Sequence, residues 1–279
     1  MEAKSGLPPI PVSEIEKHLA GSVDTIHRHT AIACLLDNSV YSGVYVKCFG
    51  YEGILTAGHC ATDFLAASRF ALVVSEKAHQ FWVEPNFFEH IAIEHDEYED
   101  YTADGPDLSF VIIRDINLLR TLRRLVAFYD LEKQDTNVFR NDLAKFNWSV
   151  AGVPSEKIEE TKIIVNGEEY RMVNTTAAVI QGNLVGIETR NNFDYIKLRL
   201  LTGIEEFPKS YNGVSGGGIW YQRFIAKEDN TYTVAPILAG ITVWQSKEPE
   251  KMQRFITGHG FASIYGTVRR ILAQKRYLP

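Results

Sequence analysis

Residues 213–218 read Gly-Val-Ser-Gly-Gly-Gly. A serine hydroxyl is a poor nucleophile unless a base takes its proton. Attack on a carbonyl also needs backbone N–H groups that meet the developing oxyanion. Glycines on both sides of Ser215 permit positive φ and a close approach of the backbone. The segment predicts either a nucleophile loop, with the N–H groups of Gly213 and Ser215 as oxyanion donors, or a plain turn between strands. It is not a P-loop, because no Gly-Lys-Ser/Thr follows.

Two further segments carry groups that suit a serine nucleophile. Residues 55–60 read Leu-Thr-Ala-Gly-His-Cys, where His59 ends a β-type segment and can be held with one face open. Residues 106–113 read Pro-Asp-Leu-Ser-Phe-Val-Ile-Ile. An aspartate at the mouth of an apolar strand is costly to bury unless it is paired, and a histidine N–H would suit Asp107. Asp104 is a rival acid. Each segment alone also fits a structural histidine or a turn aspartate.

The hydrophobic pattern along the chain predicts mostly strands. From about residue 28 to 113, and again from 149 to 264, short runs rich in Val, Ile, Tyr and Phe alternate with turn signals. Helices of the kind that join parallel strands are missing from this pattern, which favours an all-β fold. Helical spacing occurs within 114–146 and at Tyr265–Arg276, and a helix is expected to open the chain. The last strand is expected at Gly260–Ile264.

The three motifs occur in the order His59, Asp107, Ser215, and here the sequence resembles the trypsin/chymotrypsin-like serine peptidases. Thr-Ala-Gly-His-Cys resembles the family's Thr/Ser-Ala-Ala-His-Cys, and the Asp107 segment resembles its Asp-Ile-Ala-Leu strand. Gly-Val-Ser-Gly-Gly resembles its Gly-Asp-Ser-Gly-Gly. The resemblance implies a catalytic triad in which Ser215 attacks a peptide carbonyl, His59 moves the proton and Asp107 orients His59. It implies no metal and no organic cofactor. An α/β-hydrolase would present these residues in another order.

The resemblance covers about residues 28 to 276 and implies a two-barrel organisation. We expect two antiparallel six-stranded β-barrels with helices at both ends of the chain. An N-terminal extension, partly helical, takes 1–27, and the first barrel takes 28–120 with His59 and Asp107. A connection at 121–146 leads to a second barrel at 147–279, which carries Ser215 and a C-terminal helix. The extension is expected either to pack on the barrels or to serve as a docking helix.

The sequence departs from the family beside the nucleophile. Secreted members carry an aspartate where this chain has Val214, and that aspartate pairs with a newly cleaved N-terminus. A valine cannot form the ion pair, so we expect the oxyanion loop to be formed from the start or ordered by a partner, substrate or ligand. The family's disulfides are also missing. Cys48 and Cys60 are expected either to bond to each other or to be buried thiols.

Substrate specificity depends on residues near the nucleophile. The resemblance places Lys209 at the base of the pocket for the side chain before the cleaved bond, which would favour acidic or polar side chains there. An ordinary exposed lysine is the alternative. Further expected substrate-binding residues are Val243, Trp244 and Gln245, on a strand that would pair with the substrate backbone, and His259, which is expected to be a specificity group or a turn residue.

Composition excludes several other classes of protein. Hydrophobic residues make up 45% and charged residues 23% of the 279 residues, which fits a folded globular chain. A formal net charge of −6 gives no basic footprint for nucleic acid, so no nucleic-acid partner is expected. We expect neither a membrane span nor a secretory signal, and hence a cytoplasmic location.

These observations predict a serine endopeptidase with restricted protein or peptide substrates, whose activity depends on a regulatory partner or ligand. The alternative is a catalytically silent binding module with a protease fold and a collapsed oxyanion loop.

Overall fold

The computed structural model of the chain describes residues 12–74, 79–93, 106–133, 147–165, 168–175, 177–200, 208, 211–226, 232–248 and 253–277.

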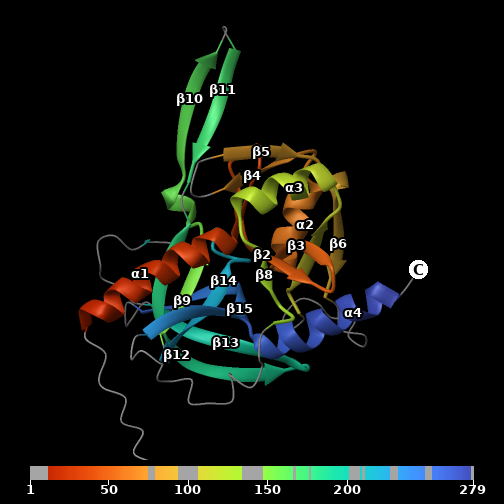
Figure 1. The fold of residues 1–279 in the computed structure, drawn as a ribbon. Helices are drawn as coiled ribbons and strands as arrows, with labels where there is room; N and C mark the ends of the chain where they lie inside the picture. Colours follow the sequence, from red (N-terminus) through yellow and green to blue (C-terminus); the bar gives the residue numbers. More distant parts are fainter. Residues whose placement is uncertain are drawn as a thin grey trace, which may run out of the picture.

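Six antiparallel strands of the C-terminal half close into a barrel in the order β12-β13-β16-β15-β14-β9 (Figure 1). Their bounds are β9 Asn147–Gly152, β12 Ala178–Arg190, β13 Phe193–Leu200, β14 Gly218–Ala226, β15 Tyr232–Glu248 and β16 Gln253–His259. The largest fully buried side chains here are Trp148 and Trp220. They belong to a hydrophobic cluster that also includes Val44 and Phe110 of the N-terminal half. The two halves therefore share this cluster as a common core between them.

The N-terminal half is an eight-stranded sheet in the order β5-β4-β1-β2-β3-β7-β6, and β8 pairs in parallel with β2. The bounds are β1 Thr30–Cys34, β2 Val40–Cys48, β3 Tyr51–Thr56, β4 Phe70–Val74, β5 His79–Val83, β6 Phe88–Ala92, β7 Ser109–Ile113 and β8 Tyr129–Asp130. The sheet-dominated fold with a barrel and terminal helices is confirmed. This half differs from a closed six-stranded barrel, because β5 and β6 end the sheet in the described part of the chain. Helices cover the open face instead, with Phe64, Leu118 and Leu122 packed on it.

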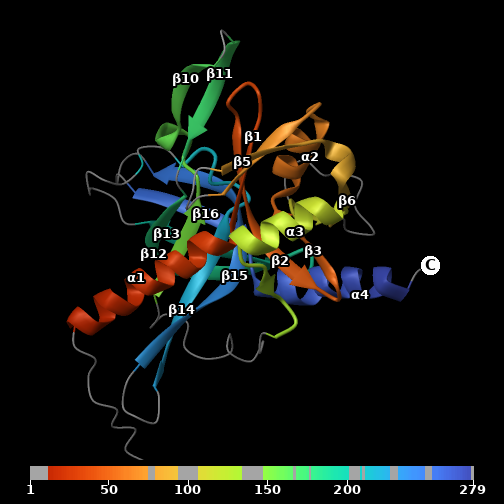
Figure 2. The ribbon, with the colours of Figure 1, turned by 45° about the horizontal axis from the view of Figure 1, so that its top comes forward.

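The helical segments are α1 Val12–His29, α2 Gly58–Ala66, η1 Pro85–Phe87, α3 Ile116–Leu125, η4 Ser155–Lys157, η6 Ala262–Val268 and α4 Arg269–Tyr277. The N-terminal extension packs on the body of the protein, since Ile26 of α1 is fully buried and Gln222 donates a hydrogen bond to Ser22 at 3.0 Å (Figure 2). Asp115 begins α3 by accepting the N–H of Leu118 at 2.6 Å, as side-chain caps do. The expected domain boundaries stay predictions.

A two-stranded hairpin projects from the barrel (Figure 1). Its strands are β10 Glu159–Val165 and β11 Glu168–Asn174, which pair in antiparallel register. The hairpin follows directly after η4. Ser155 of η4 is hydrogen-bonded to the loop that carries Ser215, as described below.

Two expectations about local structure are wrong. The expected strand Gly260–Ile264 is the beginning of the C-terminal helix, and the strand itself ends at His259. The reason is Asp194, whose carboxylate accepts the N–H groups of Ala262 at 3.0 Å and Ser263 at 2.7 Å and so starts a helix there. His59 also does not end a strand, because it lies in the first turn of α2.

Burial of His259 makes the stability of the protein depend on pH. Its ring packs between Phe193 and Tyr195, and neither ring nitrogen has a hydrogen-bond partner among the described residues. Burial lowers the pKa of His259 to about 4 from 6.5, while the charge of Asp107 acts weakly against this. Burial also lowers the pKa of His29. The folded protein therefore holds these rings neutral at a pH where the unfolded chain protonates them.

We expect the contribution of His259 to the free energy of unfolding to be full above pH 6.5 and to be lost as the pH drops toward 4. His259 alone should contribute a loss on the order of 3 kcal/mol over that range. Urea unfolding at a series of pH values measures this. His259→Phe keeps the ring and removes the proton, so its profile should be flatter. Equal slopes in both proteins would contradict the prediction.

Candidate active site

Ser215 lies in the second of two consecutive tight turns, which meet at Val214. The N–H of Val214 donates to the carbonyl of Tyr211 at 3.1 Å, and the N–H of Gly217 donates to the carbonyl of Val214 at 2.9 Å. In each turn the third residue is a glycine with positive φ, +87° at Gly213 and +84° at Gly216. A Cβ on Gly216 would lie 2.1 Å from the carbonyl oxygen of Ser42. Glycine is therefore required at position 216, both for the positive φ and for the close approach to Ser42.

The hydrogen bonds of the loop leave two N–H groups free. The carbonyl of Asn212 accepts the N–H of Ser155 at 2.7 Å, and the carbonyl of Val214 is held by the second turn. A planar trans peptide points its N–H away from its C=O. The N–H groups of Gly213 and Ser215 therefore point away from these anchors. Neither donates a hydrogen bond within the described residues. They are the two donors that the sequence predicts for an oxyanion.

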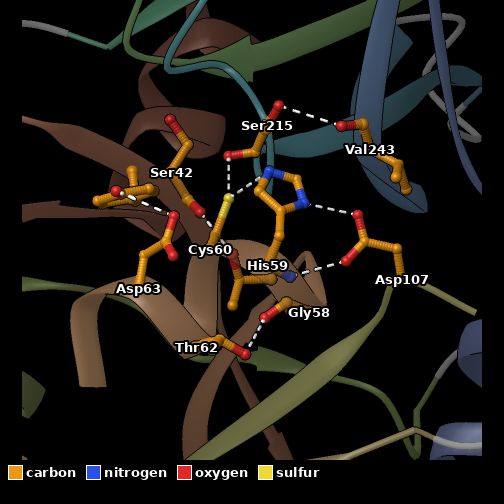
Figure 3. Close-up of polar contacts among 11 residues, drawn as sticks. Ser42, Gly58, His59, Cys60, Thr62, Asp63, Asp107, Ser215 and Val243 are labelled. Atoms are coloured by element: carbon orange, nitrogen blue, oxygen red, sulfur yellow. Dashed lines mark hydrogen bonds and ion pairs between the residues drawn. The ribbon is translucent and has the colours of Figure 1, made fainter. Parts of the chain in front are cut away.

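Asp107 holds His59 by two hydrogen bonds. Its Oδ1 accepts the backbone N–H of His59 at 2.8 Å, and its Oδ2 lies 2.6 Å from Nδ1 of the ring (Figure 3). His59 belongs to the first turn of α2, and Asp107 lies just before β7. The His59 side chain is 47% exposed. Asp104, the rival acid, lies outside the described residues.

The hydroxyl of Ser215 is turned away from His59. It donates to the carbonyl of Val243 on β15 at 3.1 Å, while Nε2 of His59 lies 3.3 Å from Sγ of Cys60 (Figure 3). The Cys60 thiol donates to the carbonyl of Ser215 at 3.4 Å. One assignment of protons satisfies all these contacts: Nδ1–H donates to Asp107 and Nε2–H donates to the sulfur. The ring of His59 is then an imidazolium.

The electrostatics agree with a charged His59. The hydrogen bond to Asp107, followed by the one to Cys60, raises the pKa of His59 to about 10. Burial acts to raise the pKa of Asp107, but the hydrogen bonds and charge of His59 outweigh it and hold that pKa below its ordinary value. The pair is therefore a charged couple at neutral pH, and His59 must lose a proton before it can act as a base.

The predicted specificity residues take different places. Val243 points its carbonyl at Ser215, and Trp244 is 38% exposed beside Tyr195. Gln245 accepts the N–H of Tyr211 and donates to the side chain of Asn212, so it braces the loop of Ser215. The ring of His259 has no accessible surface, so the structure does not bring it to the surface of the site. Lys209 lies outside the described residues.

Val214 offers no charge for an ion pair, and the cysteines form no disulfide. The side chain of Val214 is fully buried in the shared core. Cys34, Cys48 and Cys60 are all free and buried, so the Cys48–Cys60 bond that the spacing allowed is not formed. Burial raises the pKa of Cys34 to about 12 and is the first cause of a raised pKa at Cys60.

Two negative findings concern the described residues only. None of their His, Cys, Asp and Glu side chains form a group of three or more that could hold a metal ion. None of their helices is long and apolar enough to cross a membrane.

Three residues at the site carry no signal in the sequence. Ser42 contacts the loop from the N-terminal half, where Thr56 donates to the carbonyl of Ser42, and Ser155 contacts the loop from η4. They are single serines and threonines distant from Ser215 along the chain, so no local pattern could mark them. Cys60 was part of the histidine motif, but its contact with Nε2 of His59 depends on the ring's orientation in the folded protein.

The closed barrel, the open eight-stranded sheet of the first half and the terminal helices together form a trypsin-like fold. No protein-family model matches the chain, and no curated protein matches it by sequence. Among solved structures, it is similar to a serine endoprotease from Yersinia pestis, with 17% identity and a TM-score of 0.42, over 96% of this chain and 65% of the other.

Two further solved structures are similar to this chain. An HtrA-type protease, AlgW, solved with a tripeptide, has 13% identity and a TM-score of 0.44, over 92% of this chain and 62% of the other. Deg5 has 12% identity and a TM-score of 0.44, over 83% and 86%. The chain spans less than two thirds of the length of the first two proteases. Identities and TM-scores this low say nothing of the activity of this chain.

Removing the sulfur beside His59 should make the ring less basic. In Cys60→Ala, Nε2 loses the contact that is the second cause of its raised pKa. We therefore expect the pKa of His59 to fall, which an NMR titration of the ring measures directly. Cys34→Ala removes a buried thiol away from the site and should leave the titration unchanged. An unaltered pKa in Cys60→Ala would show that the thiol does not hold the proton on His59.

Proposed function

We propose that this chain is a serine endopeptidase that cleaves peptide bonds through His59, Asp107 and Ser215. The observation that supports this most is the loop of Ser215, where the N–H groups of Gly213 and Ser215 have no acceptor in the described part of the chain and lie beside a paired His59–Asp107 couple. Backbone N–H groups without a protein acceptor are available to a ligand or to water, and these two belong to half-buried residues. A developing oxyanion is a partner that would satisfy both.

The reaction needs two changes from the described arrangement. His59 must release the proton on Nε2, and Ser215 must rotate its hydroxyl from Val243 to that nitrogen. A peptide that pairs with β15 would help with the second change, because its N–H can donate to the Val243 carbonyl in place of the serine. Substrate binding would then release the hydroxyl of Ser215 for catalysis.

The chemical steps follow from these positions. Oγ of Ser215 bonds to the peptide carbonyl carbon, and its proton passes to Nε2 of His59. The carbonyl oxygen becomes negative between the N–H groups of Gly213 and Ser215. The C–N bond then breaks, the amine leaves with the proton from His59, and an acyl-enzyme remains. Water attacks this ester by the same route and restores Ser215.

A binding module without catalysis is the second candidate. It is favoured by the contact between His59 and Cys60 and by the pKa of His59 near 10, because an imidazolium cannot take the proton of Ser215. If this arrangement persists when a peptide binds, the chain recognises peptides without cutting them.

The proposed enzyme acts on protein or peptide substrates and is controlled by a regulatory partner. Lys209 would favour acidic or polar side chains before the cleaved bond.

A fluorophosphonate probe separates the two candidates. We expect it to modify Ser215, as mapped by mass spectrometry, and the adduct to be absent in His59→Ala. His90→Ala is a matched control, because His90 lies 2.9 Å from the hydroxyl of Ser109 and forms a second serine–histidine pair between β6 and β7. Labelling should persist in His90→Ala and should not occur at Ser109. A wild-type protein that stays unlabelled at all pH values would favour the binding module.

Asp107→Asn tests the acid of the triad. The amide can no longer hold His59 in the tautomer that accepts a proton at Nε2, so we expect the labelling rate to fall about 10⁴-fold. The apparent pKa of the reaction should also fall, because Asp107 is the first cause of the raised pKa of His59. Labelling at the wild-type rate would mean that another acid, for which Asp104 is a candidate, orients His59.

A further inference from the structure

The two peptides that flank Gly213 are each held by a serine hydroxyl from another part of the chain. Ser155 donates to the carbonyl of Asn212 twice, through its N–H at 2.7 Å and its Oγ at 2.9 Å. Ser42 donates its Oγ to the carbonyl of Gly213 at 2.7 Å. Both planes beside Gly213 are therefore fixed from outside the loop.

Ser42 also forms a hydrogen bond to the loop at a second point. It is a buried residue of β2, and its backbone N–H donates to the carbonyl of Ser215 at 3.3 Å. Its hydroxyl also accepts the N–H of Val153 at 2.9 Å, which fixes the rotamer that reaches Gly213. In Figure 3, Ser42 and Val243 lie on opposite sides of Ser215. The loop is thus held between the sheet of the first half and β15 of the barrel.

A loop built on glycine needs such an anchor. Gly213 has φ of +87°, and a glycine reaches alternative conformations at low cost. Rotation of the Asn212–Gly213 peptide would turn the N–H of Gly213 away from the site and destroy one oxyanion donor. Val214 offers no charge that could anchor the loop, since its side chain is buried in the core.

We propose that Ser42 and Ser155 form a hydroxyl clamp that holds the oxyanion hole in its working shape without an activating ion pair. They are positioning residues, because their hydroxyls act on the substrate only through the two peptides that flank Gly213. The proposal rests on the function proposed above, since an oxyanion donor has a role only if Ser215 reacts. It means that the loop is formed in the resting protein and that no cleavage of the chain is needed to shape it.

The test compares single variants in the full chain. Ser42→Ala and Ser155→Ala each remove one hydroxyl, and Ser155→Thr keeps it. Ser149→Ala is the matched control, because Ser149 is fully buried and its hydroxyl has no hydrogen-bond partner among the described residues. Two quantities are measured: the limiting rate and the half-saturating concentration for the fluorophosphonate, and hydrogen exchange of the backbone amides of residues 211–217.

We expect the limiting rate to fall about tenfold or more in Ser42→Ala and Ser155→Ala, at an unchanged half-saturating concentration, because the oxyanion hole acts in the transition state. The amides of Val214, Gly216 and Gly217 should exchange faster in both variants. Ser155→Thr and Ser149→Ala should behave as the wild type. Ser155 is exposed, so its variants keep the test open if Ser42→Ala does not fold.

The outcomes separate the two proposals. A wild-type protein that is not labelled overturns the proposed function, and the exchange measurement then decides whether the hydroxyls hold the loop. Unchanged exchange in both alanine variants overturns the clamp. Faster exchange with an unchanged labelling rate in an active wild type overturns the positioning role. A slower rate that Ser155→Thr fails to restore also overturns it, because the hydroxyl would not be the cause.

Discussion

A planar trans peptide cannot point its C=O and its N–H to the same side, and the candidate site depends on that constraint. In the loop of Ser215, hydrogen-bond donors bind the carbonyls, and each bound carbonyl determines where the following N–H points. Ser155 sets the N–H of Gly213 from outside the loop, and the second turn sets the N–H of Ser215 from within it. The chemistry of the loop is thus decided by what binds its carbonyls, while its glycines make the shape possible.

The positive charge on His59 keeps the candidate site in a resting state. Asp107 orients the ring and raises its pKa, which is useful once a proton has been taken from Ser215 but keeps the base occupied beforehand. Cys60 adds to this by accepting the hydrogen on Nε2. The hydroxyl of Ser215 meanwhile occupies the Val243 carbonyl, where a substrate N–H would bind. In the proposed enzyme, catalysis begins when a peptide replaces these internal contacts.

Much of the fold and the residues brought together at the site could be predicted from the sequence, because their signals are local. The strands show their pattern within a few residues, and His59, Asp107 and Ser215 each carry a flanking motif. The rest depends on contacts between distant segments. Asp194 turns the expected strand at Gly260–Ile264 into a helix by accepting N–H groups from a distant part of the sequence.

The same limit applies to the site. The serines that hold the loop are ordinary until the two halves meet, and the rotamer of Ser215 depends on β15. The open edge of the first sheet was not foreseen either. The helices α2 and α3 cover its apolar face with Phe64, Leu118 and Leu122, and that packing depends on how the strands pair.

The contact between Ser42 and Gly213 joins residues 171 positions apart. Contacts of such separation close late during folding, since the loop entropy must be overcome before they form. A chain that has emerged from synthesis only as far as the first half has no partner for Ser42, and a barrel without the first sheet has no hydroxyl for Gly213. In the proposed enzyme, the site would therefore become able to cleave peptides only at the last step of folding. The nascent chain and its neighbours would be protected by topology, with no removable segment required.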